Sequence, residues 1–225
     1  MHAKLLTLPA VTLSAVLALA YGGFARDLAT AGVENGALAA LKASSIVALA
    51  CLALAHRARL LAAALSFGAA GDALLALDTQ ASFLAGAGAF LIGRVCYIAL
   101  FLRSGNGVSS LTLPPRLFAA LTMIAAAIAG TVWLVPSASP LFEPLAIYTG
   151  VLTVMSISTF TLPCLRWLAM LGGVLFFVSD GFVAHNMFSP AADPQVAFTL
   201  SFSGWMIYWA GQAALCIGAL TLKPR

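Results

Sequence analysis

Charged residues are scarce in this sequence. Its 225 residues include 11 Lys and Arg and 7 Asp and Glu, so that 8% are charged, whereas soluble domains carry about 25%. A soluble core of this size could not bury the 62% of residues that are hydrophobic. The few basic residues form no polar face of the kind that binds nucleic acid. The composition therefore predicts an integral membrane protein surrounded by lipids, with no nucleic-acid partner.

Histidine and cysteine are also few, with 3 His and 4 Cys. Cys51, Cys96, Cys164 and Cys216 lie in or beside apolar runs and form no Cys-x-x-Cys pair. Zinc sites need several well-spaced ligands, so we expect neither a metal nor another cofactor. We interpret the four cysteines as small buried hydrophobic residues.

Long apolar runs, by contrast, fill most of the chain. A bilayer crossing takes about 20 apolar residues, and the first run is too long for the 7–15 residues of a signal-peptide core. The runs predict an all-α fold, a single transmembrane domain over residues 1–225 that forms a bundle of eight membrane helices. Their expected positions are 5–24, 36–55, 60–77, 82–102, 116–135, 141–160, 165–186 and 198–222.

The basic residues between the runs predict the orientation of the bundle, because Lys and Arg collect in cytoplasmic loops. With the N-terminus inside, only Arg26 falls in an outer loop, while the outer loops hold the acidic Asp27, Glu34, Asp78 and Asp193. The inner segments hold Lys4, Arg57, Arg59, Arg103, Arg116, Arg166, Lys223 and Arg225. We therefore expect a multi-pass protein of the inner (plasma) membrane with both termini cytoplasmic.

The two halves of the sequence are weakly alike. Asp72 follows glycine in the third helix and Asp180 precedes glycine in the seventh, and a shift of 108 residues aligns the two aspartates. Arg94 follows glycine in the fourth helix and Gln212 follows glycine in the eighth. A duplicated unit of four helices keeps its orientation, so this pattern suggests two parallel four-helix repeats.

Ionisable residues within the membrane are costly and are functional candidates by default. Lys42, Asp72 and Asp180 each lie about six residues from the outer end of their helices. At 1.5 Å per residue, all three share a layer about 9 Å below the outer boundary. Arg94 and Gln212 lie deeper, near the middle of the membrane.

Other polar residues lie near this layer. Trp205, Tyr208 and Gln212 have the i, i+3, i+7 spacing of one helix face. Tyr148 and Tyr208 fall close to the layer, and Asn186 lies near its outer mouth. We expect Lys42, Arg94, Tyr148, Tyr208, Gln212 and Asn186 to contact a substrate. The alternative interpretation is structural: ion pairs and aromatic contacts that only hold helices together.

At these residues the sequence resembles the YhhN-like family of membrane proteins, which includes the lysoplasmalogenases. The similar segments are Gly71–Leu75, Phe90–Ile98, Gly173–Asp180 and Tyr208–Gln212, within a resemblance from about Lys42 to Leu220. The resemblance implies hydrolysis of the vinyl ether bond of a lysophospholipid, the lysoplasmalogen, to a fatty aldehyde and a glycerophospho-base.

By the same resemblance, Asp72 and Asp180 correspond to the family's paired aspartates and Lys42 to its lysine in the second helix. The sequence departs from the family at two positions. Ala43 stands where a proline usually follows that lysine, and Arg94 stands where the fourth helix usually has histidine. Arginine does not release a proton at useful pH, so we expect no proton relay through that position.

Two carboxyl groups suit this chemistry, because protonation of a vinyl ether at carbon creates an oxocarbenium ion that water captures. Our hypothesis is that Asp180, beside Phe176 and Phe177, keeps its proton and acts as the acid, while Asp72 stays ionised near Lys42, stabilises the cation and orients water. The two roles could also be exchanged.

Three other functions fit the same residues. Buried Asp and Lys also serve transporters of small amphiphiles or ions, and the charges of an assembly protein could act only as glue between helices. Within the hydrolases, another lysolipid could be the substrate.

Overall fold

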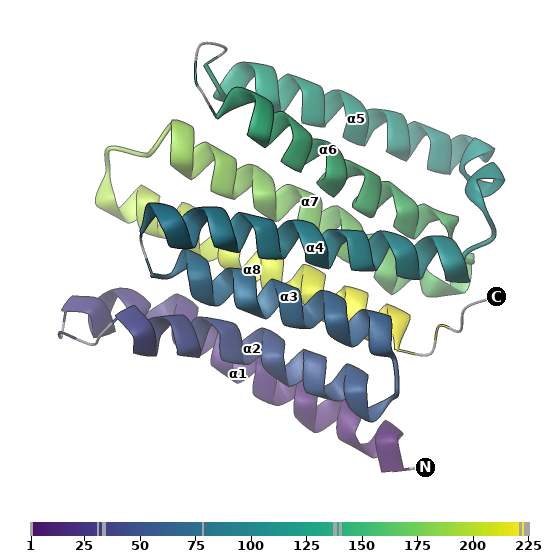
Figure 1. Ribbon diagram of the computed structural model, residues 1–225, viewed down its shortest axis with the longest axis horizontal. Coiled ribbons are helices and arrows are strands. Elements are labelled where there is room, and N and C mark those ends of the chain that lie inside the picture. Colours follow the sequence, from purple (N-terminus) through teal and green to yellow (C-terminus); the bar gives the residue numbers. More distant parts are fainter. Residues whose placement is uncertain are drawn as a thin grey trace. The chain divides into compact units, whose positions relative to one another are not determined.

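The computed structural model describes residues 2–30, 32, 35–77, 79–136, 139, 141–220 and 222. Within this part of the chain it contains eight α-helices, three short 3-10 helices and no strand, which confirms the all-α prediction and the eight predicted helices (Figure 1). The α-helices are α1 (His2–Thr30), α2 (Asn35–Ala55), α3 (Arg59–Leu75), α4 (Gln80–Ser104), α5 (Pro114–Leu134), α6 (Phe142–Ser158), α7 (Trp167–Phe188) and α8 (Pro194–Ala219). The 3-10 helices are η1 (Val108–Thr112), η2 (Thr159–Thr161) and η3 (Cys164–Arg166).

Six of these segments are long and apolar enough to cross a membrane, which is compatible with a multi-pass membrane protein. They are Leu5–Ala25, Asn35–Ala55, Gln80–Ser104, Pro114–Leu134, Phe142–Thr161 and Cys164–Phe188. The two other helices are α3, which is 17 residues long, and α8, which carries the polar Gln212 within its apolar sequence. Eight crossings and two repeats remain predictions.

The predicted start of the last helix, residue 198, was wrong by four residues, because α8 begins at Pro194. Asp193 caps the helix: its Oδ1 accepts the N–H of Gln195 at 2.7 Å and that of Val196 at 3.1 Å. Proline is favoured in the first turn of a helix, where its missing N–H costs nothing. The Asp-Pro pair is thus a start signal that apolarity alone overlooked. The same helix also ends at Ala219, before the predicted end at 222.

The first helix was also predicted too short, since α1 extends beyond residue 24 to Thr30. Arg26, Asp27 and Thr30 interrupt the apolar run after Phe24, but polar residues do not by themselves end a helix. The turn comes at Gly32, whose φ of +82° suits glycine. The start of α1, His2, lies three residues before the predicted residue 5, and the ends of α2 to α7 differ from the predicted ones by at most two residues.

The chain forms two compact units. The first comprises Met1–Tyr97 and Cys216–Leu222, and the second comprises Ile98–Leu215 and Lys223–Arg225. The division falls within α4 and α8, so each unit is described by itself. The prediction of a single transmembrane domain remains a prediction.

In the first unit, α1, α2 and α3 pack side by side (Figure 1). A short turn joins α2 to α3, and Arg57 has a φ of +59° there. The Ala58 N–H donates to the Ala53 carbonyl at 2.9 Å and the Arg57 N–H to the Leu54 carbonyl at 2.8 Å. These two bonds satisfy the last carbonyls of α2 and reverse the chain.

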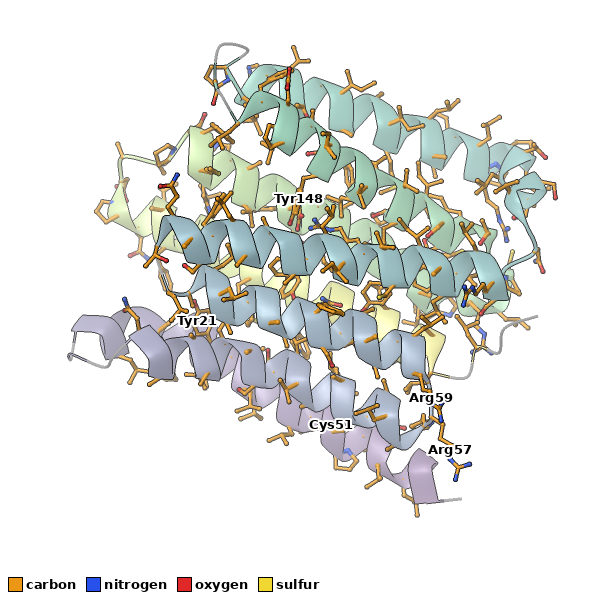
Figure 2. All side chains as sticks on the ribbon, viewed as in Figure 1. Tyr21, Cys51, Arg57, Arg59 and Tyr148 are labelled. Atoms are coloured by element: carbon orange, nitrogen blue, oxygen red, sulfur yellow. The ribbon has the colours of Figure 1, made fainter. Side chains whose placement is uncertain are left out.

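The turn places charge at one end of this hairpin. Figure 2 shows Arg57 and Arg59 at the turn and Tyr21 toward the opposite end of the helices. Among the residues used to predict orientation, several lie outside the described part of the chain: Glu34, Asp78, Lys223 and Arg225, together with the side chains of Lys4 and Arg26.

Small residues let helices approach closely in both units, as is common in membrane bundles. A Cβ on Gly71 of α3 would lie 2.6 Å from Cδ2 of Phe90 in α4. A Cβ on Gly172 of α7 would lie 2.6 Å from the backbone nitrogen of Leu215 in α8. A neighbouring helix therefore fills the space beside each of these glycines, through a side chain at Gly71 and through its backbone at Gly172.

The interpretation of all four cysteines as buried was wrong. Cys51 and Cys164 are exposed and Cys96 is intermediate, whereas Cys216 is buried. A thiol is a small apolar group, so within an apolar helix it can occupy an outward face, where lipid replaces water, at little cost.

Candidate functional site

Lys42 and Asp72 form the charged centre of the first unit. The Lys42 Nζ lies 4.0 Å from Oδ1 of Asp72, and Asp72 is only 3% exposed. Burying an ionised carboxylate is costly unless an opposite charge or hydrogen bonds accompany it. The ammonium of Lys42 provides such an opposite charge for the Asp72 carboxyl group.

The α2–α3 hairpin brings this pair together. Lys42 lies 13 residues before Ala55, the last residue of α2, and Asp72 lies 13 residues after Arg59, the first residue of α3. In an antiparallel pair of helices, residues equally far from the turn lie at the same level. The short turn thus places the two charges in one layer, as we predicted for these two residues.

Tyr21 of α1 also contacts Lys42. The Lys42 Nζ lies 5.8 Å from the centroid of the Tyr21 ring, within the range of a cation–π contact. We did not select Tyr21 from the sequence. The available signal was its position, a few residues from the outer end of the first apolar run and close in depth to Lys42.

Arg94 is almost completely buried in the same unit, at 1% exposed. It lies on α4, one turn after Phe90, and its Cζ is 5.8 Å from the centroid of the Phe90 ring. Its neighbour Gly93 lies close to α3, because a Cβ there would be 3.0 Å from the Ala64 carbonyl oxygen. A guanidinium so enclosed suits anion recognition, for which its planar fork is shaped.

The second unit holds a polar and aromatic cluster around Tyr208. The Gln212 Nε2 donates to the Tyr208 hydroxyl at 3.0 Å, and both side chains are buried. The Tyr208 ring packs edge-on against Phe176 of α7, with centroids 5.3 Å apart, and lies 5.6 Å from the ring of Trp205. These contacts confirm that Trp205, Tyr208 and Gln212 share one face of α8.

Asp180 lies on α7, one turn after the buried Phe176, and is itself partly buried. Between these two residues, Ser179 turns its hydroxyl back to donate to the Phe176 carbonyl at 2.7 Å. The apolar setting of Asp180 remains a prediction.

The other predicted binding residues lie in the second unit as well. Asn186, near the end of α7, donates through Nδ2 to the Ser201 hydroxyl of α8 at 3.4 Å. Tyr148 lies partly buried on α6 (Figure 2).

The structure therefore brings together two predicted pairs: Lys42 with Asp72, and Tyr208 with Gln212. Asp72 belongs to the first compact unit and Asp180 to the second, and their meeting across one pocket remains a prediction. Within the described residues, no group of three or more His, Cys, Asp and Glu side chains gathers in a way that could hold a metal ion.

Comparison with known proteins yields one match. The model of the YhhN family matches residues 38–219, a range that includes the Lys42–Asp72 pair, the Tyr208–Gln212 pair and every predicted site residue. No curated protein matches the chain, and no solved structure matches it.

Proposed function

Because this chain belongs to the YhhN family, we propose that it is a membrane-embedded hydrolase. The substrate in this proposal is a lysoplasmalogen, whose vinyl ether bond is cleaved to a fatty aldehyde and a glycerophospho-base. Asp72 and Asp180 carry the reaction, and the proposal requires that they face the same substrate.

The observation that carries the proposal is the Asp72 carboxylate, 3% exposed and 4.0 Å from the Lys42 ammonium. An ionised carboxylate enclosed by helices is expensive to maintain, so a structural role alone gives a weak reason for it. A catalytic role, in which the carboxylate must remain ionised beside a developing cation, explains its presence better.

The reaction divides between the two aspartates. Asp180, one helical turn after Phe176 on α7, donates its proton to the second carbon of the vinyl ether, and the oxygen-bearing carbon becomes an oxocarbenium ion. Asp72 stabilises this cation, and it accepts a proton from the water that attacks the same carbon, which yields a hemiacetal.

Collapse of the hemiacetal restores both carboxyl groups. Its hydroxyl proton returns to Asp180 as the C–O bond to glycerol breaks and the aldehyde forms. The proton held by Asp72 passes to the departing glycerol oxygen. One water is consumed, and each aspartate ends in its starting state.

The remaining polar side chains serve substrate binding in this proposal. Arg94 and Lys42 are the cations available to the phosphate, with the guanidinium of Arg94 shaped for bidentate contact. Tyr148, Tyr208, Gln212 and Asn186 contact the glycerol and headgroup through hydroxyl and amide groups.

Replacement of the aspartates tests the proposal. Asp72→Asn and Asp180→Asn keep the shape of the side chains but remove the ionisable group. We expect each variant to lose about 10²–10⁴-fold in turnover, which is the usual contribution of a general acid or base. The measurement is aldehyde release from lysoplasmalogen by purified protein, followed by mass spectrometry, with thermal unfolding as the check on folding.

Asp27→Asn is the matched control, because Asp27 is exposed on α1, and it should keep full activity. An ester-linked lysophosphatidylcholine serves as the substrate control. Substantial activity in either Asp72→Asn or Asp180→Asn would refute the pair, and movement of lipid across proteoliposomes without cleavage would assign the chain to the transporters.

A further inference from the structure

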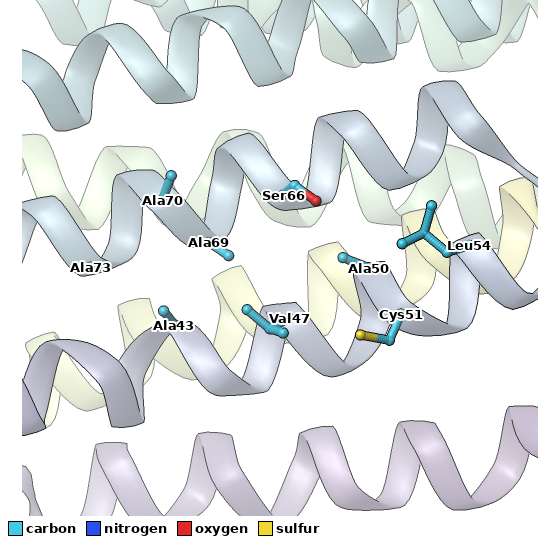
Figure 3. A pocket seen from close by; sticks show the side chains of 9 residues that line it. All are labelled: Ala43, Val47, Ala50, Cys51, Leu54, Ser66, Ala69, Ala70 and Ala73. Carbon is cyan, nitrogen blue, oxygen red and sulfur yellow. The ribbon is translucent and has the colours of Figure 1, made fainter.

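An apolar groove runs between α2 and α3 in the first unit (Figure 3). It encloses about 310 Å³ and is lined by five side chains of α2 and four of α3. Of these nine, only Ser66 carries a hydroxyl, and five are alanines. Alanines are too small to fill the space between the helices, so the groove remains open along its length.

The groove opens outward rather than into the core. Val47 is 45% exposed and Leu54 is 57% exposed, and Cys51 between them is exposed as well. The helix that carries these residues, α2, is one of the segments apolar enough to span a membrane. The open side of the groove is therefore suited to lipid.

One end of the groove adjoins the charged pair. Its lining includes Ala43 and Ala73, the residues that directly follow Lys42 and Asp72. From Ala43 the groove extends to Leu54, eleven residues further along α2, which is about 16 Å at 1.5 Å per residue. A charged end and a long apolar remainder are the two parts of an amphiphile.

We propose that this α2–α3 groove binds the single aliphatic chain of a lysophospholipid, with the headgroup at the Lys42 end. Its volume lies at the lower end of the 300–1,000 Å³ typical of ligand pockets, which favours one chain over two. The inference rests on the proposed function for the identity of the substrate, and it places the bond between headgroup and chain beside Asp72.

A photoreactive lysolipid tests the groove without turnover. The probe is an ether lysophosphatidylcholine with a saturated alkyl chain, which has no vinyl ether to cleave, and a diazirine in the middle of that chain. After illumination of the full-length protein in liposomes, mass spectrometry maps the labelled residues. We expect the label to concentrate on Val47, Cys51 and Ala69, within the groove.

A pair of matched variants provides the control. Val47→Trp fills the groove from an exposed position and should lower the labelling of α2 and α3 about tenfold, the effect of 1.4 kcal/mol in binding. Val16→Trp, on α1, makes the same change at a position that is 58% exposed and outside the groove, so its labelling should be unchanged. Thermal unfolding confirms that both variants fold.

Three results would overturn the inference. The first is even labelling over all lipid-facing side chains, and the second is equal labelling of the two tryptophan variants. The third is a disulfide between the Cys51 residues of two copies, which would show that a second copy of the chain occupies the groove. Groove labelling without aldehyde release from lysoplasmalogen would refute the proposed function and leave the binding site intact. Aldehyde release together with labelling outside the groove would support the proposed function and refute the groove as the binding site.

Discussion

At the scale of single residues, the chain concentrates its electrostatic cost in a few side chains. Asp72 and Arg94 are both nearly inaccessible, at 3% and 1% exposed. Each lies beside an apolar or aromatic neighbour, with Phe90 facing both Gly71 and Arg94. In such surroundings a charge interacts strongly with its partner, because little water screens it. The interaction energy between Lys42 and Asp72 should therefore be large enough to measure.

A double-mutant cycle on Lys42 and Asp72 measures it. We expect Lys42→Met and Asp72→Asn each to lower the free energy of unfolding in detergent, because each leaves the opposite charge without its partner. The double variant should lose less than the sum, with a coupling of about 0.5–3 kcal/mol.

The control cycle combines Arg57→Gln with Asp72→Asn. Arg57 lies at the α2–α3 turn, 15 residues from Asp72 in sequence, which is about 20 Å along the helix. These two changes should be additive. If the Lys42 cycle is as additive as this control, the ion pair contributes nothing to stability.

At the scale of helices, glycines determine how closely α7 and α8 pack. At Gly172 an added Cβ would meet the backbone of α8, 2.6 Å from the Leu215 nitrogen and 2.8 Å from the Gly211 carbonyl oxygen. Backbone atoms cannot turn aside as a flexible side chain can. The two helices must separate to admit even a methyl group.

Gly172→Ala should therefore destabilise the protein by about 1–3 kcal/mol, the usual cost of overpacking. Gly181→Ala is the control on the same helix, since a Cβ there meets nothing within 4 Å. That change should be neutral or stabilising by up to about 1 kcal/mol, because alanine favours helix over glycine. The measurement is thermal unfolding in micelles, and equal effects at the two positions would contradict the role of Gly172 in packing.

At the scale of the whole molecule, the charges in the loops predict the orientation of the helices. Arg57 and Arg59 lie at the α2–α3 turn, and Arg103 lies at the end of α4. If the N-terminus is cytoplasmic and all eight helices cross the membrane, the α2–α3 turn and the end of α4 both lie on the cytoplasmic side. If α3 does not cross, Arg103 lies on the opposite side from Arg57.

Reporter fusions separate these two arrangements. We expect a fusion after Arg103 to be cytoplasmic and a fusion after Pro136 to be exported, because α5 lies between them. The readouts are fluorescence of a reporter that folds only in the cytoplasm and activity of a phosphatase that is active only outside. An exported fusion after Arg103 would show that fewer than eight helices cross the membrane.

The local sequence was sufficient to predict the helices and the charged residues within them. Apolarity over about 20 residues depends only on neighbours along the chain, and a charge inside such a run is conspicuous whatever surrounds it. Helix ends were less well predicted where a cap decides them, as Asp193 does for α8.

The tertiary structure alone decided which side chains face one another. The pairing of Lys42 with Asp72 depends on the length of the α2–α3 turn, and the contact of Tyr21 with Lys42 depends on how α1 rotates against α2. The groove between α2 and α3 exists because alanines of these two successive helices face each other. Apolar helices are so similar in composition that the sequence of each helix does not specify which of its faces meets a neighbour. The choice of contacting faces is made by side-chain packing between helices, which exists only in the folded chain.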